Sequence, residues 1–94
     1  MALLMERPNG NGWAHLVSDL HGEPGMLELR KFLRDIGVRR SLHRAMTYAE
    51  HCDIRGEEIR NALNSGAQVI SRRQLAVLLK DKKREAGKSV ECWV

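Results

Sequence analysis

The amino-terminal part of the chain alternates short apolar runs with turn-forming residues. Ala2–Met5 is an apolar run that ends at Glu6, and the six residues after it are rich in Pro, Asn and Gly. This pattern predicts a short strand followed by an exposed loop. Ala14–Ser18 predicts a second strand, and its two-residue period places His15 and Asp19 on one face. A helix over the same residues would also bring these two side chains together, because they are four residues apart.

The clearest period in the chain is helical and begins shortly after this second strand. Pro24 suits the first turn of a helix because its missing N–H would have no partner there. Apolar residues then recur every three or four positions and form one stripe, which consists of Met26, Leu29, Phe32, Leu33 and Ile36. Gly37 follows the stripe and predicts a left-handed stop to the helix.

The middle of the chain predicts shorter elements. In order, they are an irregular segment at 39–47, a strand at 48–54, a helix at 56–65 and a strand at 67–70. The first of these strands would carry His51 and Asp53 on one face, since they are two residues apart. The short helix would pack through Ile59, Ala62 and Leu63.

A last helix is predicted from Ser71 onward. Ser71 and Gln74 have the spacing of a capping box, in which each side chain satisfies the free backbone N–H of the other residue. The buried stripe of this helix would be Leu75, Leu78 and Leu79. At 100° per residue, the basic side chains Arg73, Lys80 and Arg84 fall within about 40° of one another, nearly opposite that stripe. We therefore expect them to form an exposed row.

Together these elements predict a small single α/β domain with three or four short strands and three helices. The 94 residues form one domain with a modest core, and the polar stretch 85–94 is expected to be a tail that docks Trp93. The chain has neither a run of about 18 apolar residues nor a signal peptide's basic and apolar regions, so we expect a cytoplasmic protein with no membrane partner. Cys52 and Cys92, without CxxC spacing, are interpreted as thiols.

The formal charge of +4 is concentrated near the carboxyl terminus, where residues 72–88 hold seven Lys or Arg against two acidic residues. Such asymmetry favours an anionic partner, either nucleic acid or a host or partner protein, although a solvated helix face would look the same. The candidate binding residues are Arg72, Arg73, Lys80, Lys83, Arg84 and Lys88. Because the chain has few aromatic residues, contact with phosphates is more plausible than stacking on bases.

Two histidine and aspartate couples are the candidate chemical site: His15 with Asp19, and His51 with Asp53. If the first and third strands were parallel neighbours, these residues and Glu6 would converge near strand ends, where open α/β sheets bind ligands. The group could then hold a divalent metal and hydrolyse a phosphoester or an amide, with Glu6 as general base. It could equally be a structural lock, because networks of ionisable groups often only stabilise a fold.

Cys52 lies between His51 and Asp53, so it should point to the opposite face of the strand and be a buried core thiol.

Several short motifs in order give the chain a resemblance to a known family. They are Trp13, His15-Leu16-Val17-Ser18-Asp19, a helix that starts with Leu27-Glu28-Leu29, Ile36-Gly37, His51-x-Asp53, and Gly66-Ala67 leading through Ile70-Ser71 to a basic helix. Over most of residues 2–84 this pattern resembles the family called domain of unknown function 4031. In that family an aspartate is usual where this chain has Glu6, and a tyrosine where it has Cys52.

The resemblance implies a small intracellular α/β domain of bacteria and their phages, with no activity that can be carried over. The leading expectation is therefore an accessory or regulatory module that needs no cofactor and binds an anionic partner through its basic helix. The alternative is a metal-dependent, nuclease-like hydrolase that uses the His/Asp cluster.

Overall fold

The computed structural model describes residues 2–88, with Lys88 described in its backbone only. Four strands form one mixed sheet in the order β3-β2-β1-β4. They are β1 (Leu3–Glu6), β2 (Trp13–Ser18), β3 (Cys52–Arg55) and β4 (Gln68–Ile70). β2 runs antiparallel to both β1 and β3, and β1 runs parallel to β4. With the three helices described below, this confirms the predicted small α/β fold.

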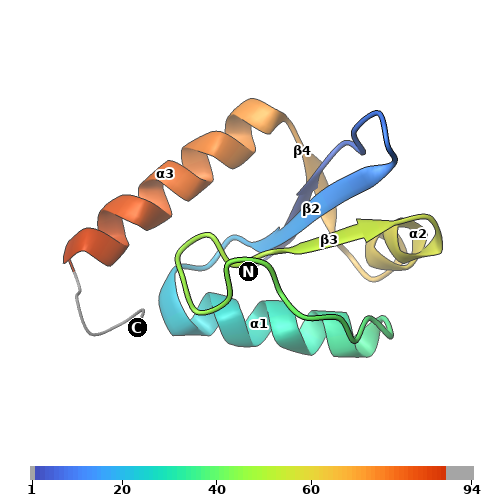
Figure 1. Ribbon diagram of the computed structural model, residues 1–94, viewed down its shortest axis with the longest axis horizontal. Helices are drawn as coiled ribbons and strands as arrows, with labels where there is room; N and C mark the ends of the chain where they lie inside the picture. The colour runs from blue at the N-terminus through green and yellow to red at the C-terminus, as the bar shows by residue number, and fades with distance from the viewer. Residues whose placement is uncertain (1, 89–94) are drawn as a thin grey trace.

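The helices lie on both sides of the sheet. They are α1 (Gly22–Asp35), α2 (Glu57–Asn64) and α3 (Arg72–Lys88). Figure 1 shows α1 below the sheet and α3 above it. Alternate residues of β1, β2 and β3, among them Met5, Leu16 and Ile54, enter one core with Leu29 and Leu33 of α1. The residues between them therefore point to the other face, which α3 covers only in part.

α1 follows its predicted stripe closely. Met26, Leu29 and Leu33 are buried, and Phe32 and Ile36 pack at the edge of the core. The helix begins at Gly22, so Pro24 lies in the first turn, where its missing N–H is tolerated. Gly37 adopts a φ of 82° and ends the helix in the left-handed conformation, as predicted.

The strand predicted at 48–54 is wrong in its first half, because β3 begins only at Cys52. Before it, the chain makes turns, and only an isolated bridge joins His51 to His43. The buried carboxylate of Glu50 accepts hydrogen bonds from the Met46 N–H and from the Arg30 side chain. These bonds hold the loop in a shape that an extended strand could not take.

Two buried stripes were predicted incompletely. In α2, Ala62 is buried and Ile59 packs at the core, but Leu63 is 43% exposed because this two-turn helix turns that side away from the sheet. In α3, Leu75 is buried while Leu78 and Leu79 are only partly so.

The predicted capping box at the start of α3 is confirmed. The Gln74 N–H donates to Ser71 Oγ at 3.0 Å, and the Ser71 N–H donates to Gln74 Oε1 at 2.8 Å. α3 continues through Lys88, into the stretch expected to be a tail, and the expected docking of Trp93 lies outside the described residues. In the described part of the chain, none of the helices combines the length and apolar character needed to cross a membrane.

Candidate metal centre on the open face of the sheet

His15 and Asp53 are brought together by strand pairing. β2 and β3 run antiparallel, and their register places His15 directly opposite Asp53. Both side chains point away from the α1 core, because Ala14, Leu16, Cys52 and Ile54 beside them point into it. His15 Nε2 lies 3.5 Å from Asp53 Oδ1.

Glu6 orients the His15 ring. It is the last residue of β1, its side chain is only 7% exposed, and both of its carboxylate oxygens lie 2.9 Å from His15 Nδ1. The backbone N–H of His15 donates to the same carboxylate. A carboxylate can only accept, so Nδ1 carries a hydrogen, and in the neutral form of the ring Nε2 presents a lone pair toward Asp53.

His51 presents a second lone pair to the same oxygen. Its Nδ1 lies 2.8 Å from the carbonyl oxygen of Ala49, which can only accept, so Nδ1 is the donor. Its Nε2 lies 3.5 Å from Asp53 Oδ1. Burial lowers the pKa of His51 below its ordinary value, although the Ala49 carbonyl and Asp53 act to raise it. The ring is therefore neutral at physiological pH and available as a ligand.

Asp53 Oδ1 is the centre of the cluster and is buried without a hydrogen-bond partner among the described residues. Nε2 of His15 and Nε2 of His51 each lie 3.5 Å from it, and when both rings are neutral these three atoms are all acceptors with no hydrogen between them. A buried acceptor left unsatisfied costs about 1–3 kcal/mol. The three atoms lie within 4.8 Å of one another. One cation between them would satisfy all three.

The donor set of His15, His51 and Asp53 fits a divalent transition metal. Two imidazoles and one carboxylate, with a further position open, are typical of catalytic zinc and of non-haem iron sites. Ligands about 2.0 Å from a tetrahedral zinc ion are about 3.3 Å apart, close to the 3.5 Å between each Nε2 and Asp53 Oδ1. Glu6 and the Ala49 carbonyl accept hydrogen bonds from Nδ1 of His15 and of His51, on the side of each ring away from Asp53. Metal-binding histidines commonly have such orienting partners.

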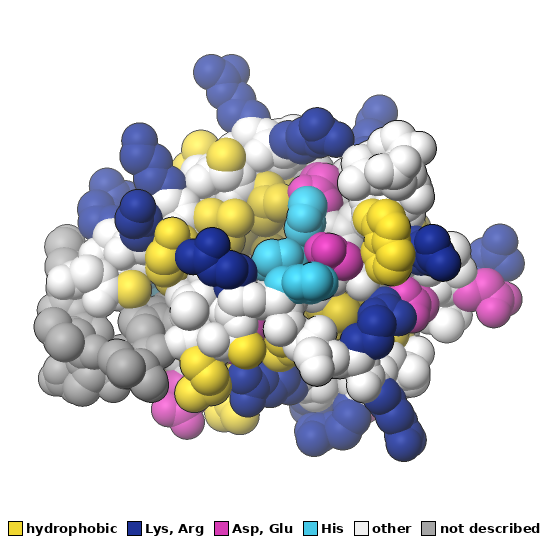
Figure 2. Space-filling view, viewed as in Figure 1, with side chains coloured by type: hydrophobic (Ala, Val, Ile, Leu, Met, Phe, Trp, Pro, Cys, Tyr) yellow, Lys and Arg dark blue, Asp and Glu magenta, His cyan; other side chains and the backbone are white. Residues whose placement is uncertain are grey.

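A third histidine borders the centre. His43 stacks on His51 with ring centroids 5.2 Å apart, and its Nε2 lies 3.4 Å from Asp53 Oδ2. Its side chain is 58% exposed. Figure 2 shows the histidine side chains gathered on one face beside acidic side chains and open to solvent. A bound ion would therefore be accessible from outside.

The comparisons with known proteins point to one family. The model of a family described as "Protein of unknown function (DUF4031)" matches residues 4–82. The chain belongs to this family. No curated protein and no solved structure matches it. The part of this DUF4031 chain that matches contains Glu6, His15, His51 and Asp53, and therefore the whole cluster.

The structure separates Asp19 from His15. β2 ends at Ser18, and Asp19 Oδ1 accepts a hydrogen bond from the N–H of Ala2, at the end of β1 remote from Glu6. The condition under which these residues were expected to converge, with the first and third strands as parallel neighbours, is not met, because β2 lies between β1 and β3. The cluster forms on the open face of the sheet, from the last residue of β1, the middle of β2 and the start of β3.

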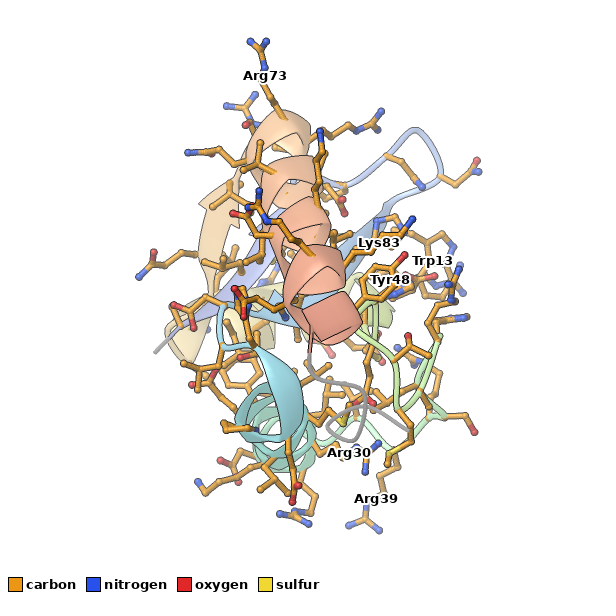
Figure 3. All side chains as sticks on the ribbon, turned by 90° about the vertical axis from the view of Figure 1, so that its left-hand side faces the viewer. Trp13, Arg30, Arg39, Tyr48, Arg73 and Lys83 are labelled. Carbon is orange, nitrogen blue, oxygen red and sulfur yellow. The ribbon has the colours of Figure 1, made fainter. Side chains whose placement is uncertain are left out.

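The predicted basic residues of this DUF4031 chain divide between two sides of α3. Arg73, Lys80 and Arg84 are exposed as predicted, and Arg84 contacts Asp81 one turn before it. Arg72 lines a cleft between α3 and the sheet. Lys83 is exposed and points toward the side where Tyr48 lies, whereas Arg73 projects away from the molecule (Figure 3). The side chain of Lys88 lies outside the described residues.

Sequence reasoning missed Lys82, which is buried and donates a 2.6 Å hydrogen bond to the carbonyl oxygen of Ser18. Its position was a usable signal, because it follows Leu75, Leu78 and Leu79 on the same helical stripe. His43 and Arg44, which border the site, lie in the segment without a period and left no comparable signal.

Proposed function

We propose that this protein binds one divalent transition-metal ion of the zinc type and uses it for hydrolysis. The ligands are Nε2 of His15, Nε2 of His51 and Oδ1 of Asp53. The observation that carries the proposal is the buried Asp53 Oδ1, which has no hydrogen-bond partner among the described residues and lies 3.5 Å from Nε2 of both His15 and His51. This supports metal binding, on which the hydrolase alternative depends, over a purely structural lock, since a lock would place a hydrogen-bond donor against that oxygen.

The chemistry would follow from the open coordination positions. A divalent ion held by three protein ligands would lower the pKa of a coordinated water to about 7. The water oxygen would attack the substrate, the bond to the leaving group would break, and the water proton would pass through a base to that group. His43, beside Asp53 and open to solvent, is the candidate base. Glu6 is already engaged by His15, which supports a positioning role in place of the general-base role expected from the sequence.

Metal titration tests the binding step. We expect the full chain to bind one Zn²⁺ or Co²⁺ by calorimetry, with a Co²⁺ absorption spectrum that reports imidazole ligands. His51→Ala or Asp53→Asn should weaken binding more than about 100-fold, and Glu6→Gln about 10-fold, because it removes only an orienting partner. His21→Ala is the matched control, since His21 is exposed and outside the cluster. Failure to bind one ion per chain, or equal loss in the control, would overturn the proposal.

A second measurement tests hydrolysis. The zinc-loaded, cobalt-loaded and manganese-loaded proteins are assayed against p-nitrophenyl acetate, an aryl phosphate and an amide. We expect turnover with at least one substrate, abolished by Asp53→Asn and kept by His21→Ala. A protein that binds the ion but turns over none of these substrates would refute the hydrolase part alone.

A second candidate function is binding of a nucleic acid through the outer side of α3. It is supported by the exposure of Arg73, Lys80 and Arg84 along one side of a helix that is not covered by the sheet. Contacts from such a row would be made to phosphates and would depend strongly on salt. The two functions are compatible, because the outer side of α3 and the metal cluster do not share residues.

A further inference from the structure

A cleft lies between α3 and the open face of the sheet, next to the metal cluster. Its volume is about 510 Å³, and both His15 and His51 line it. The remaining walls are largely apolar and include Val17, Leu75 and Leu79. Small-molecule sites commonly have volumes of about 300–1,000 Å³ and apolar walls with a few polar groups. The cleft therefore has the size and lining of a site for a small organic molecule.

Trp13 forms a fixed part of the cleft wall. Its ring is flanked by the guanidinium groups of Arg55, at 4.7 Å from the ring centroid, and Arg40, at 5.9 Å. Arg40 is held in turn by two hydrogen bonds to the carboxylate of Glu58. Cation–π contacts and this ion pair fix the indole in one orientation. Trp13 therefore contributes an ordered wall to the cleft.

Two cationic side chains line the same cleft and come from different parts of the chain. Arg72 is the first residue of α3, and Arg44 belongs to the loop before β3. Neither makes an ion pair within the part of the chain that the structure describes. Guanidinium groups recognise phosphate and carboxylate oxygens with paired hydrogen bonds. Both arginines are therefore available to an anionic ligand.

The loop that carries Arg44 is held in an unusual conformation. Arg44 and Met46 have positive φ angles of 54° and 65°, which side-chain-bearing residues rarely adopt. Thr47 donates to the Arg44 carbonyl oxygen from both its N–H and its hydroxyl, and Glu50 accepts from the Met46 N–H. Such strained backbone persists only where the surroundings enforce it, and it is concentrated at binding sites.

We propose that the substrate class of this site is a small organic phosphate monoester, a proposal that rests on the metal-dependent function above. The phosphate group is bound between the metal ion, Arg44 and Arg72, and the organic group occupies the cleft beside Leu75 and Trp13. Together, a divalent ion, two arginines, Asp53 and Glu6 carry a net charge of +2. A phosphate monoester dianion neutralises this charge. A carboxylic ester carries no negative charge, and a carboxylate neutralises only half of the positive charge.

The reaction balances as a simple hydrolysis. The oxygen of water forms a bond to phosphorus, the ester P–O bond breaks, and the leaving alcohol takes the proton that the water loses. The products are inorganic phosphate and the free alcohol. The two arginines stabilise the negative charge on the equatorial oxygens of the phosphoryl group as this happens.

Calorimetry with phenyl phosphate tests the inference. We expect the zinc-loaded protein to bind phenyl phosphate at least about tenfold more tightly than inorganic phosphate, because the phenyl ring fills the apolar cleft. Arg72→Gln should weaken binding of phenyl phosphate about tenfold, and Arg44→Gln combined with it should weaken binding further. The control is Arg34→Gln with Arg39→Gln, which removes the same charge outside the cleft; Figure 3 shows Arg39 far from α3.

Each variant is first loaded with Co²⁺, whose absorption spectrum shows that the metal site and the fold are intact. If the ion binds but phenyl phosphate does not, the proposed substrate class is wrong and the metal site stands. The same conclusion follows if phenyl phosphate binds the arginine variants as tightly as it binds the control. Equal binding to the metal-free protein would also overturn it. If no ion binds, it is the proposed function itself that fails.

Discussion

At the scale of single residues, Lys82 shows how one buried charge ties two layers together. Its amino group reaches from α3 to the carbonyl oxygen of Ser18 at the end of β2. Burial lowers the pKa of Lys82 below its ordinary value, while Asp19, Glu28 and Glu50 act to raise it. The lysine therefore joins α3 to the end of β2 through a hydrogen bond, in surroundings that three carboxylates make favourable to its charge.

We expect Lys82→Ala to lower the free energy of unfolding by about 2 kcal/mol, the value of a buried hydrogen bond from a charged donor. Urea denaturation followed by circular dichroism measures the change. Lys80→Ala, two residues earlier on the exposed side, is the control and should stay within about 0.5 kcal/mol of the unmodified protein. Equal effects of the two substitutions would show that the Ser18 contact contributes nothing.

Cys52 is a buried core thiol, as its position between His51 and Asp53 predicted. It is 1% exposed, and burial raises its pKa above the ordinary value. In a Cys92→Ser background, Ellman's reagent near pH 8.5, about the ordinary thiol pKa, should label the folded chain at least about 100-fold more slowly than the urea-unfolded chain. Equally fast labelling in both states would contradict the buried position.

At the scale of elements, α3 combines two surfaces with different chemistry. Its inner side contributes Arg72, Leu75 and Leu79 to the cleft, and its outer side carries Arg73 and Lys80 in solvent. The sequence predicted the outer row, because amphipathic spacing separates charged from apolar positions. It did not predict the cleft, because a cleft needs a second wall that another element supplies.

The outer row predicts salt-dependent binding to duplex DNA. With three phosphate contacts, affinity should fall about 40-fold between about 50 and about 200 mM salt. Charge reversal to Glu at Arg73, Lys80 and Arg84 should abolish most of this dependence. Reversal at three exposed arginines elsewhere, Arg34, Arg39 and Arg60, changes net charge equally and is the control. Fluorescence anisotropy measures the affinity of the unmodified protein and of both triple variants for DNA at each salt concentration. An affinity that does not change with salt would refute this candidate function.

Local pattern predicted some elements better than others. α1 was predicted well, since its stripe from Met26 to Ile36 is long and ends at a glycine that adopts the left-handed conformation. The strand expected from Tyr48 was shortened because Glu50, buried and bonded to Arg30, holds its first half as a loop. Such a contact joins residues 20 positions apart, so no local period contains it.

At the scale of the whole molecule, the metal centre joins segments that contribute separately to the fold. His15 comes from β2, Asp53 from β3 and His51 from the chain just before β3. Oδ1 of Asp53 is left without a hydrogen-bond donor among the described residues, which is a cost to the metal-free fold. A ligand that binds only the folded state stabilises it by mass action.

Zinc should therefore raise the melting temperature. At a free concentration about 100 times the Kd, the gain is about 2.7 kcal/mol. For a domain of this size that corresponds to a rise of about 10–20 °C. Differential scanning fluorimetry measures the shift, a chelator should reverse it, and Asp53→Asn should show none. An equal shift in the Asn variant would mean that zinc binds elsewhere.

The amino-acid sequence by itself determined the α/β class, the order of the elements, the ends of α1 and the cap of α3. These features depend on residues a few positions apart, whose spacing can be compared directly with helical and strand periods. Only the tertiary structure decided that His15 pairs with Glu6 and Asp53 in place of Asp19. The partners of His15 depend on the strand order and on the register that places His15 opposite Asp53. Both are set by which face of each strand is buried against α1.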